Sequence, residues 1–120
     1  MEKSSLIEIV NYKGKQIMFW RFPDGISQQE LVEITKSHIE FSRTNTQFKH
    51  VITDFSNVHV GREFMQTIKE NADVFDKLKS APIGISGLKK VLLTGFSRVL
   101  NKQIRPFDAK EEALEYLARD

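Results

Sequence analysis

The segment that most constrains this fold is residues 16–22, QIMFWRF, which carries apolar side chains on both faces of an extended stretch. Successive side chains of a strand point to opposite faces of the sheet, so Ile17 and Phe19 share one face while Met18 and Trp20 share the other. A strand that is apolar on both faces is typical of a sheet covered on both sides. We therefore expect this strand to be central and Trp20 to be part of the core.

The neighbouring segments predict an antiparallel hairpin followed by alternating helices and strands. Residues 6–12 alternate in polarity and are joined to residues 16–22 by the short turn Lys13-Gly14. Ser27 and Glu30 then form a capping box that opens a helix. The later elements are expected as helix 28–44, strand 49–54, helix 61–78, strand 81–86, helix 88–100, strand 103–107 and a last helix capped by Asp108.

The resulting order is β-β-α-β-α-β-α-β-α, which defines an α/β fold. Strands that alternate with helices imply parallel crossovers, so we expect a mostly parallel five-stranded sheet with an N-terminal antiparallel hairpin strand. The 120 residues contain no internal repeat and no interdomain linker. A length of 120 residues is typical of one domain, which we expect to cover residues 1–120.

Composition excludes several classes of protein. The absence of cysteine rules out disulfides, thiolate metal sites and cysteine catalysis. No segment resembles a signal peptide or approaches the roughly 20 apolar residues that span a bilayer, so we expect a cytoplasmic protein. The net charge of +2 is too small to indicate a nucleic-acid partner.

The charge is unevenly distributed along the chain. Seven basic residues and no acidic residue lie between Lys77 and Arg105, whereas residues 108–120 carry five acids against two bases. Runs of this kind are usually solvated faces of neighbouring helices. We adopt that interpretation for the run from Lys77 to Arg105.

Four segments carry a resemblance to a known family: residues 12–15 (YKGK), 53–58 (TDFSNV), 84–93 (GISGLKKVLL) and 107–117 (FDAKEEALEYL). Their order and spacing resemble the SpoIIAA-like domains of the STAS superfamily, a group that is also compared with CRAL-TRIO lipid-binding domains. The resemblance covers nearly the whole chain. It implies a non-enzymatic binding or regulatory module without a cofactor, and it supports the fold more than the function.

The resemblance also bears on phosphorylation. Anti-sigma-factor antagonists of this superfamily bind a partner kinase, which phosphorylates a serine at the start of the second helix. The Asp-x-Ser-x-Val segment that precedes this serine is matched here by Asp54, Ser56 and Val58, but the serine itself is replaced within residues 61–63 (GRE). The resemblance therefore implies a protein partner without a phosphoserine switch.

A candidate ligand site is expected beyond the carboxyl ends of the parallel strands, where open α/β sheets bind their ligands. Residues 23–25, 54–56 and 86–90 should converge there. The last segment would place free backbone N–H groups and two lysines at a helix N-terminus, which favours an anion, although a simple serine cap with solvated lysines explains the same pattern. The candidate anion site comprises Ser86, Gly87, Lys89, Lys90, Asp54 and Ser56.

A candidate partner surface lies on the predicted helix 88–100. Leu93, Phe96 and Leu100 border the polar side of this helix and could form an exposed apolar strip, unless the C-terminal helix covers them. The sequence leaves a homodimer open.

No catalytic or metal-binding constellation is complete in the sequence. None of the three histidines stands at metal-ligand spacing, no serine lies in a nucleophile elbow, and His38 falls on the apolar arc of a helix. We expect His38 to be a hydrogen-bonded, partly buried core residue. Three functions remain: a module that binds another protein, a carrier or sensor of an anionic lipid or small anion, and an enzyme with a dispersed site.

Overall fold

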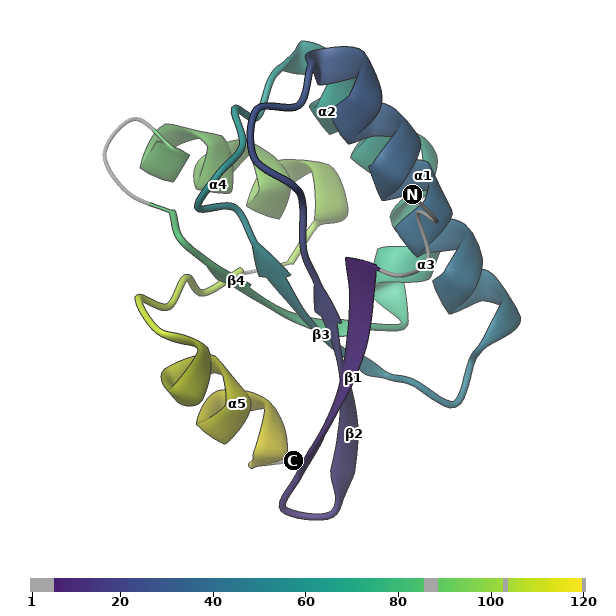
Figure 1. Ribbon diagram of the computed structural model, residues 1–120, viewed down its shortest axis with the longest axis vertical. Coiled ribbons are helices and arrows are strands. Elements are labelled where there is room, and N and C mark those ends of the chain that lie inside the picture. Colours follow the sequence, from purple (N-terminus) through teal and green to yellow (C-terminus); the bar gives the residue numbers. More distant parts are fainter. Residues whose placement is uncertain (1–5, 86–88, 103, 120) are drawn as a thin grey trace.

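Four strands and five helices make up the described part of the chain (Figure 1). The computed structural model describes residues 6–85, 89–102 and 104–119, without the side chains of residues 89–93 and 99. The strands are β1 Ile7–Tyr12, β2 Lys15–Trp20, β3 His50–Asp54 and β4 Lys79–Ile83. The helices are α1 Gln28–Thr44, α2 Arg62–Glu70, α3 Ala72–Asp76, α4 Lys89–Leu100 and α5 Lys110–Ala118.

The strands form one mixed sheet in the order β1-β2-β3-β4. β1 pairs with β2 in antiparallel orientation, and β2, β3 and β4 are mutually parallel. Lys13 and Gly14 connect β1 to β2 with φ angles of 49° and 82°, as a two-residue hairpin turn requires. The prediction of an α/β fold with an N-terminal antiparallel hairpin is therefore confirmed.

The predicted fifth strand over residues 103–107, whose first residue lies outside the described part, is wrong. Phe107 forms an isolated bridge with Ile83, and its N–H donates to the carbonyl of Pro82 at 2.9 Å. A continuous ladder needs N–H donors from β4 on this side, and Pro82, whose carbonyl faces Phe107, has none. The described sheet therefore has four strands.

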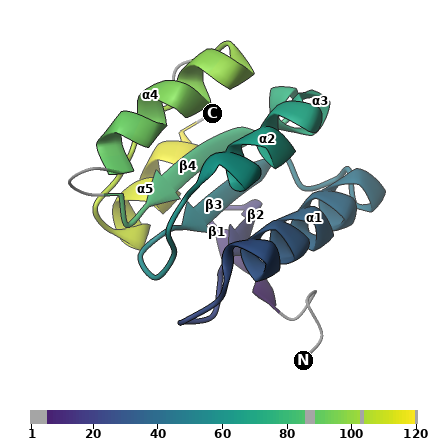
Figure 2. The ribbon, with the colours of Figure 1, turned by 90° about the horizontal axis from the view of Figure 1, so that it is seen from above.

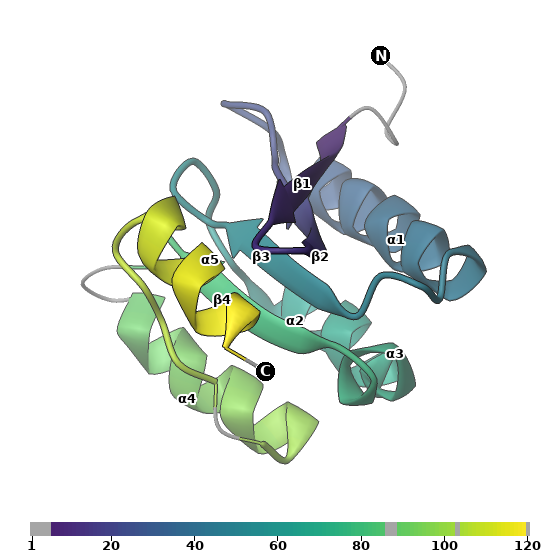
Figure 3. The same ribbon diagram turned by 90° about the horizontal axis from the view of Figure 1, so that it is seen from below.

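Helices cover the two faces of the sheet unequally. Helices α1 to α4 pack on one face, where Met18, Trp20 and Val51 belong to the larger core cluster (Figure 2). Helix α5 packs on the other face against Ile17 and Ile52 (Figure 3). Consecutive right-handed crossovers between neighbouring parallel strands place their helices on the same side, which explains this division.

Two helix boundaries differ from the sequence expectations. The predicted helix 61–78 is split into α2 and α3 at Asn71, whose side chain donates to the carbonyl of Thr67 at 2.8 Å and so competes with the helical hydrogen bonds. The N-cap of α5 is Ala109 rather than Asp108, and it makes no side-chain capping bond. The capping box of Ser27 and Glu30 at α1 is confirmed. No described helix combines the length and apolar content that a bilayer-spanning segment needs.

His38 on α1 is fully buried and has no hydrogen-bond partner among the described atoms, whereas a hydrogen-bonded, partly buried residue was expected. Its ring lies 5.2 Å from the Trp20 ring and 5.3 Å from the Phe22 ring, measured between centroids. Its exposed fraction is 0%, and neither ring nitrogen has a partner among the described atoms. Burial lowers the pKa of His38 to about 4, so the imidazole is neutral at physiological pH.

Replacement of Trp20 by alanine should destabilise the protein by about 3–5 kcal/mol, because Trp20 is only 2% exposed and its loss leaves a cavity in the larger core cluster. The measurement is urea denaturation followed by circular dichroism. Phe41→Ala, which removes a partly buried ring on α1, is the control and should cost less. A Trp20→Ala protein with a near-wild-type midpoint would contradict the placement of Trp20 in the core.

The stability of the protein should fall as the pH decreases from 6.5 towards 4. In this interval His38 is protonated in the unfolded chain and neutral in the folded chain. The contribution of His38 to the free energy of unfolding is therefore fully present above pH 6.5 and is lost as the pH falls towards 4. The loss attributable to His38 is up to about 3 kcal/mol.

His38→Leu should remove this pH dependence and leave stability at pH 7.5 equal or higher, because two unpartnered nitrogens leave the core. Urea midpoints at several pH values measure both effects, with His59→Asn at an exposed histidine as the control. An unchanged slope between pH 6.5 and 4.5 in His38→Leu would refute this account.

Candidate functional site

The loops that follow β2, β3 and β4 leave the sheet at its carboxyl end, because these strands are parallel (Figure 1). Asp54 is the last residue of β3, and Ser56 lies in the loop beyond it. Ser86 and Gly87 lie outside the described residues, as do the side chains of Lys89 and Lys90. The structure thus places two members of the predicted site at this end, and the anion site as a whole stays a prediction.

A carboxylate-centred turn fixes the loop after β3. Asp54 Oδ1 accepts hydrogen bonds from the Ser56 N–H at 2.9 Å and from Ser56 Oγ at 2.5 Å. This is the turn that an aspartate forms with the backbone two residues ahead. The N–H of Phe55 donates to the carbonyl of Ile83 at 2.9 Å. The turn is therefore attached to the end of β4.

Gly84 brings the loop after β4 against the same turn. Its φ angle is +76°, and a Cβ at this position would lie 2.3 Å from Ser56 Oγ and 2.6 Å from the Ser56 nitrogen. Any side chain would meet both a left-handed backbone and a steric clash. The sequence placed this glycine inside the predicted strand 81–86, whereas β4 ends at Ile83. The contact with Ser56 depends on the pairing of β3 with β4 and could not be read from the sequence.

A second contact fixes the entrance to α2. Gln28 at the start of α1 donates from Nε2 to the carbonyl of His59 at 2.6 Å. A Cβ at Gly61, the N-cap of α2, would lie 2.8 Å from Gln28 Oε1. The position nearest the expected serine is therefore a glycine in close contact with α1. Sequence reasoning missed Gln28, because nothing local indicates a bond over 31 positions.

The described groups that are exposed at this end can form hydrogen bonds. Ser56, Asn57 and His59 are exposed on the loop 55–61, which is fixed at both of its ends. Among the described residues, no group of three or more histidine, aspartate or glutamate side chains could hold a metal ion. The arrangement offers polar side chains on a backbone that is already ordered.

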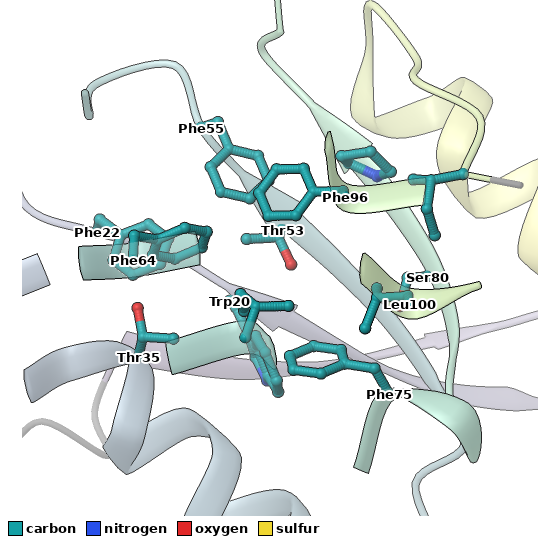
Figure 4. A pocket seen from close by; sticks show the side chains of 13 residues that line it. Trp20, Phe22, Thr35, Thr53, Phe55, Phe64, Phe75, Ser80, Phe96 and Leu100 are labelled. Atoms are coloured by element: carbon teal, nitrogen blue, oxygen red, sulfur yellow. The ribbon is translucent and has the colours of Figure 1, made fainter. Parts of the chain in front are cut away.

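A small cavity of about 50 Å³ lies below this end, between the sheet and helices α1 to α4 (Figure 4). Its wall is mainly aromatic, and the rings of Phe55, Phe64 and Phe96 lie 5.7–5.8 Å from one another, centroid to centroid. Cavities that bind small molecules usually measure roughly 300–1,000 Å³. The cavity has room for a few water molecules at most and none for an acyl chain.

The burial of the residues that line this cavity contradicts the predicted partner surface. Phe96 and Leu100 line it and are each 6% exposed, so these two residues belong to the core and not to a surface. They pack on the face of the sheet opposite α5, so the C-terminal helix does not cover them. The side chain of Leu93 lies outside the described residues.

Gly84→Ala should destabilise the protein by about 1–3 kcal/mol more than Gly25→Ala, measured by urea denaturation. Both glycines have positive φ angles, +76° and +69°, so alanine costs about 1 kcal/mol of backbone strain at either position. A Cβ at Gly25 meets nothing within 4 Å, whereas a Cβ at Gly84 clashes with Ser56. Equal losses in the two variants would show that the close contact with Ser56 does not exist.

Comparisons with known proteins support the fold. No protein-family model and no curated protein matches the sequence. The chain is similar to the solution NMR structure of the protein TM1081, with a TM-score of 0.63 over 87% of this chain and 83% of that chain. The sequence identity of 15% limits this likeness to the fold.

Proposed function

We propose that this protein is a non-enzymatic binding module of the SpoIIAA-like type, and that it binds another protein through the carboxyl end of its sheet. The observation that carries the proposal is the pre-ordered state of the loop 55–61, which joins β3 to α2 and is held at both of its ends. Its first part, the turn at Asp54 and Ser56, is attached to β4, and its last part, at His59, is attached to Gln28.

Pre-ordered loops favour protein recognition for an energetic reason. Association costs free energy whenever side chains and loops must be ordered at the interface. At this end the backbone is already held by hydrogen bonds, and exposed polar side chains such as Asn57 and His59 are available to a partner. Partners that bind with little backbone movement use surfaces of this kind.

The proposed module works without a phosphoserine switch. Gly61 stands at the N-cap of α2, and Thr67 is the one hydroxyl-bearing residue of this helix. Thr67 is buried and its hydroxyl donates to the carbonyl of Glu63 at 2.9 Å. A kinase that acts on exposed hydroxyls would find no target on α2.

The alternative is a carrier or sensor of an anionic lipid or small anion at the start of α4. The absence of any acidic residue from the first turn of α4, which begins with Lys89 and Lys90, favours an anion there. The cavity of about 50 Å³ disfavours the enclosure of a lipid tail by the described residues. For this reason the protein partner is the leading proposal.

The test begins with a photo-crosslinking amino acid at Asn57, expressed in the protein's own host, and mass spectrometry of the crosslinked partner. Binding of the purified partner is then measured for Ser56→Arg and for the matched control Thr46→Arg, which lies in the loop after α1. We expect Ser56→Arg to weaken binding by about tenfold or more and Thr46→Arg to have no effect.

Equal affinities of the two variants for the partner would contradict the proposed surface. A lipid retained in native mass spectra of the purified protein, with no crosslinked protein, would favour the alternative. Thermal unfolding of both variants verifies that neither change has altered the fold.

A further inference from the structure

A larger hollow opens at the opposite end of the sheet, where β3 and β4 begin. It measures about 420 Å³ and lies between the turn from α3 to β4, the residues after α4, and the end of α5. This volume is within the range of small-molecule sites. The hollow shares none of the residues of the proposed partner surface.

Positive charge dominates the hollow. Among the described residues, Lys49, Lys77, Lys79 and Lys102 line it together with one acid, Asp76, so these five side chains carry a formal charge of +3 (four positive, one negative). Three of the lysines come from the basic run between Lys77 and Arg105, and the fourth, Lys49, directly precedes β3. The fold thus gathers part of that run around one concave surface.

Two of these lysines are held in place by carbonyl oxygens. Lys102 Nζ donates to the carbonyl of Leu78 at 2.7 Å, and burial lowers the pKa of Lys102 although Asp76 partly opposes this shift. Lys79 Nζ donates to the carbonyl of Tyr116 at 3.2 Å and lies 4.3 Å from the centre of the Tyr116 ring. Fixed ammonium groups bind an anion with little loss of side-chain entropy.

Ser80 lines both this hollow and the small aromatic cavity (Figure 4). Its Oγ is shielded from solvent and has no hydrogen-bond partner among the described atoms. Ala81 and Ile83 belong to the core cluster under α5, so Ser80 points to the opposite face of the sheet, and the lysines carry the electrostatic argument.

The neighbouring hollow of about 200 Å³ shares Lys49, Lys77 and Leu78 with the larger one. Its arginine, Arg43, lies 2.7 Å from the carboxylate of Asp73 and also donates to Asn71, so this cation is already paired. The two shared lysines line both hollows.

We propose that the hollow at the amino end of the sheet binds a small phosphorylated molecule. A phosphate dianion matches the excess positive charge, and lysine ammonium groups bind phosphate as compact point charges. Leu78, Ile104 and the Tyr116 ring provide apolar wall for an organic group attached to the phosphate. Lys49 and Lys77 are exposed and are the lysines that approach the ligand from solvent.

The test is a titration of ¹⁵N-labelled protein with phenyl phosphate and with inorganic phosphate at constant ionic strength, with chloride as the blank. We expect shifts at the amides of Lys49, Lys77 and Ser80, and none at Ser56 or Asn57. Phenyl phosphate should bind about tenfold more tightly than inorganic phosphate, because the ring is removed from water.

Variants locate the site. Lys77→Gln and Lys49→Gln should each weaken phenyl phosphate binding about tenfold. Lys36→Gln, at an exposed position on α1, is the matched control and should bind like the wild type. Equal affinities for Lys77→Gln and Lys36→Gln, equal binding of the two probes, or shifts confined to residues 86–90 would overturn the proposal. The last result would instead place the anion at the start of α4.

Discussion

Burial of β2 on both faces is the constraint on which the rest of the structure depends. The apolar side chains of Met18 and Trp20 must be removed from water by helices on one face of the sheet. Those of Ile17 and Phe19 must be removed from water on the other face. The parallel crossovers supply the first layer with α1 to α4, and α5 alone supplies the second. The hairpin with β1 protects one side of this central strand and so completes its environment.

Parallel strands in this arrangement give the molecule two chemically different ends. At the carboxyl end, Asp54 and Gly84 fix neighbouring loops against each other through short polar and steric contacts. At the amino end, lysines from β4 and from the residues after α4 surround an open hollow. We infer that the first end recognises a protein and the second a phosphorylated small molecule, so that both could be bound at once.

Features set by nearby residues were predictable from the sequence, and features set by distant pairs were not. The hairpin, the capping box of α1 and the buried position of Trp20 follow from local spacing. The missing fifth strand depends on Pro82, which cannot donate a hydrogen bond to the segment around Phe107, and these two segments are distant in the sequence. The same limit applies to the lysine hollow, where Lys49 and Lys102 come together from opposite halves of the chain, and to the contact of Gly84 with Ser56.

The central claim is that the carboxyl end is ordered before any partner binds, and native-state hydrogen exchange tests it most directly. The account predicts that the amides of Phe55 and Ser56, bonded to Ile83 and Asp54, exchange much more slowly than the amide of Gly14 in the hairpin turn. Phe55 should be protected to a degree similar to the interior of β3. Exchange of Phe55 and Ser56 as fast as Gly14 would contradict the claim, because the proposed partner surface would then be a mobile loop.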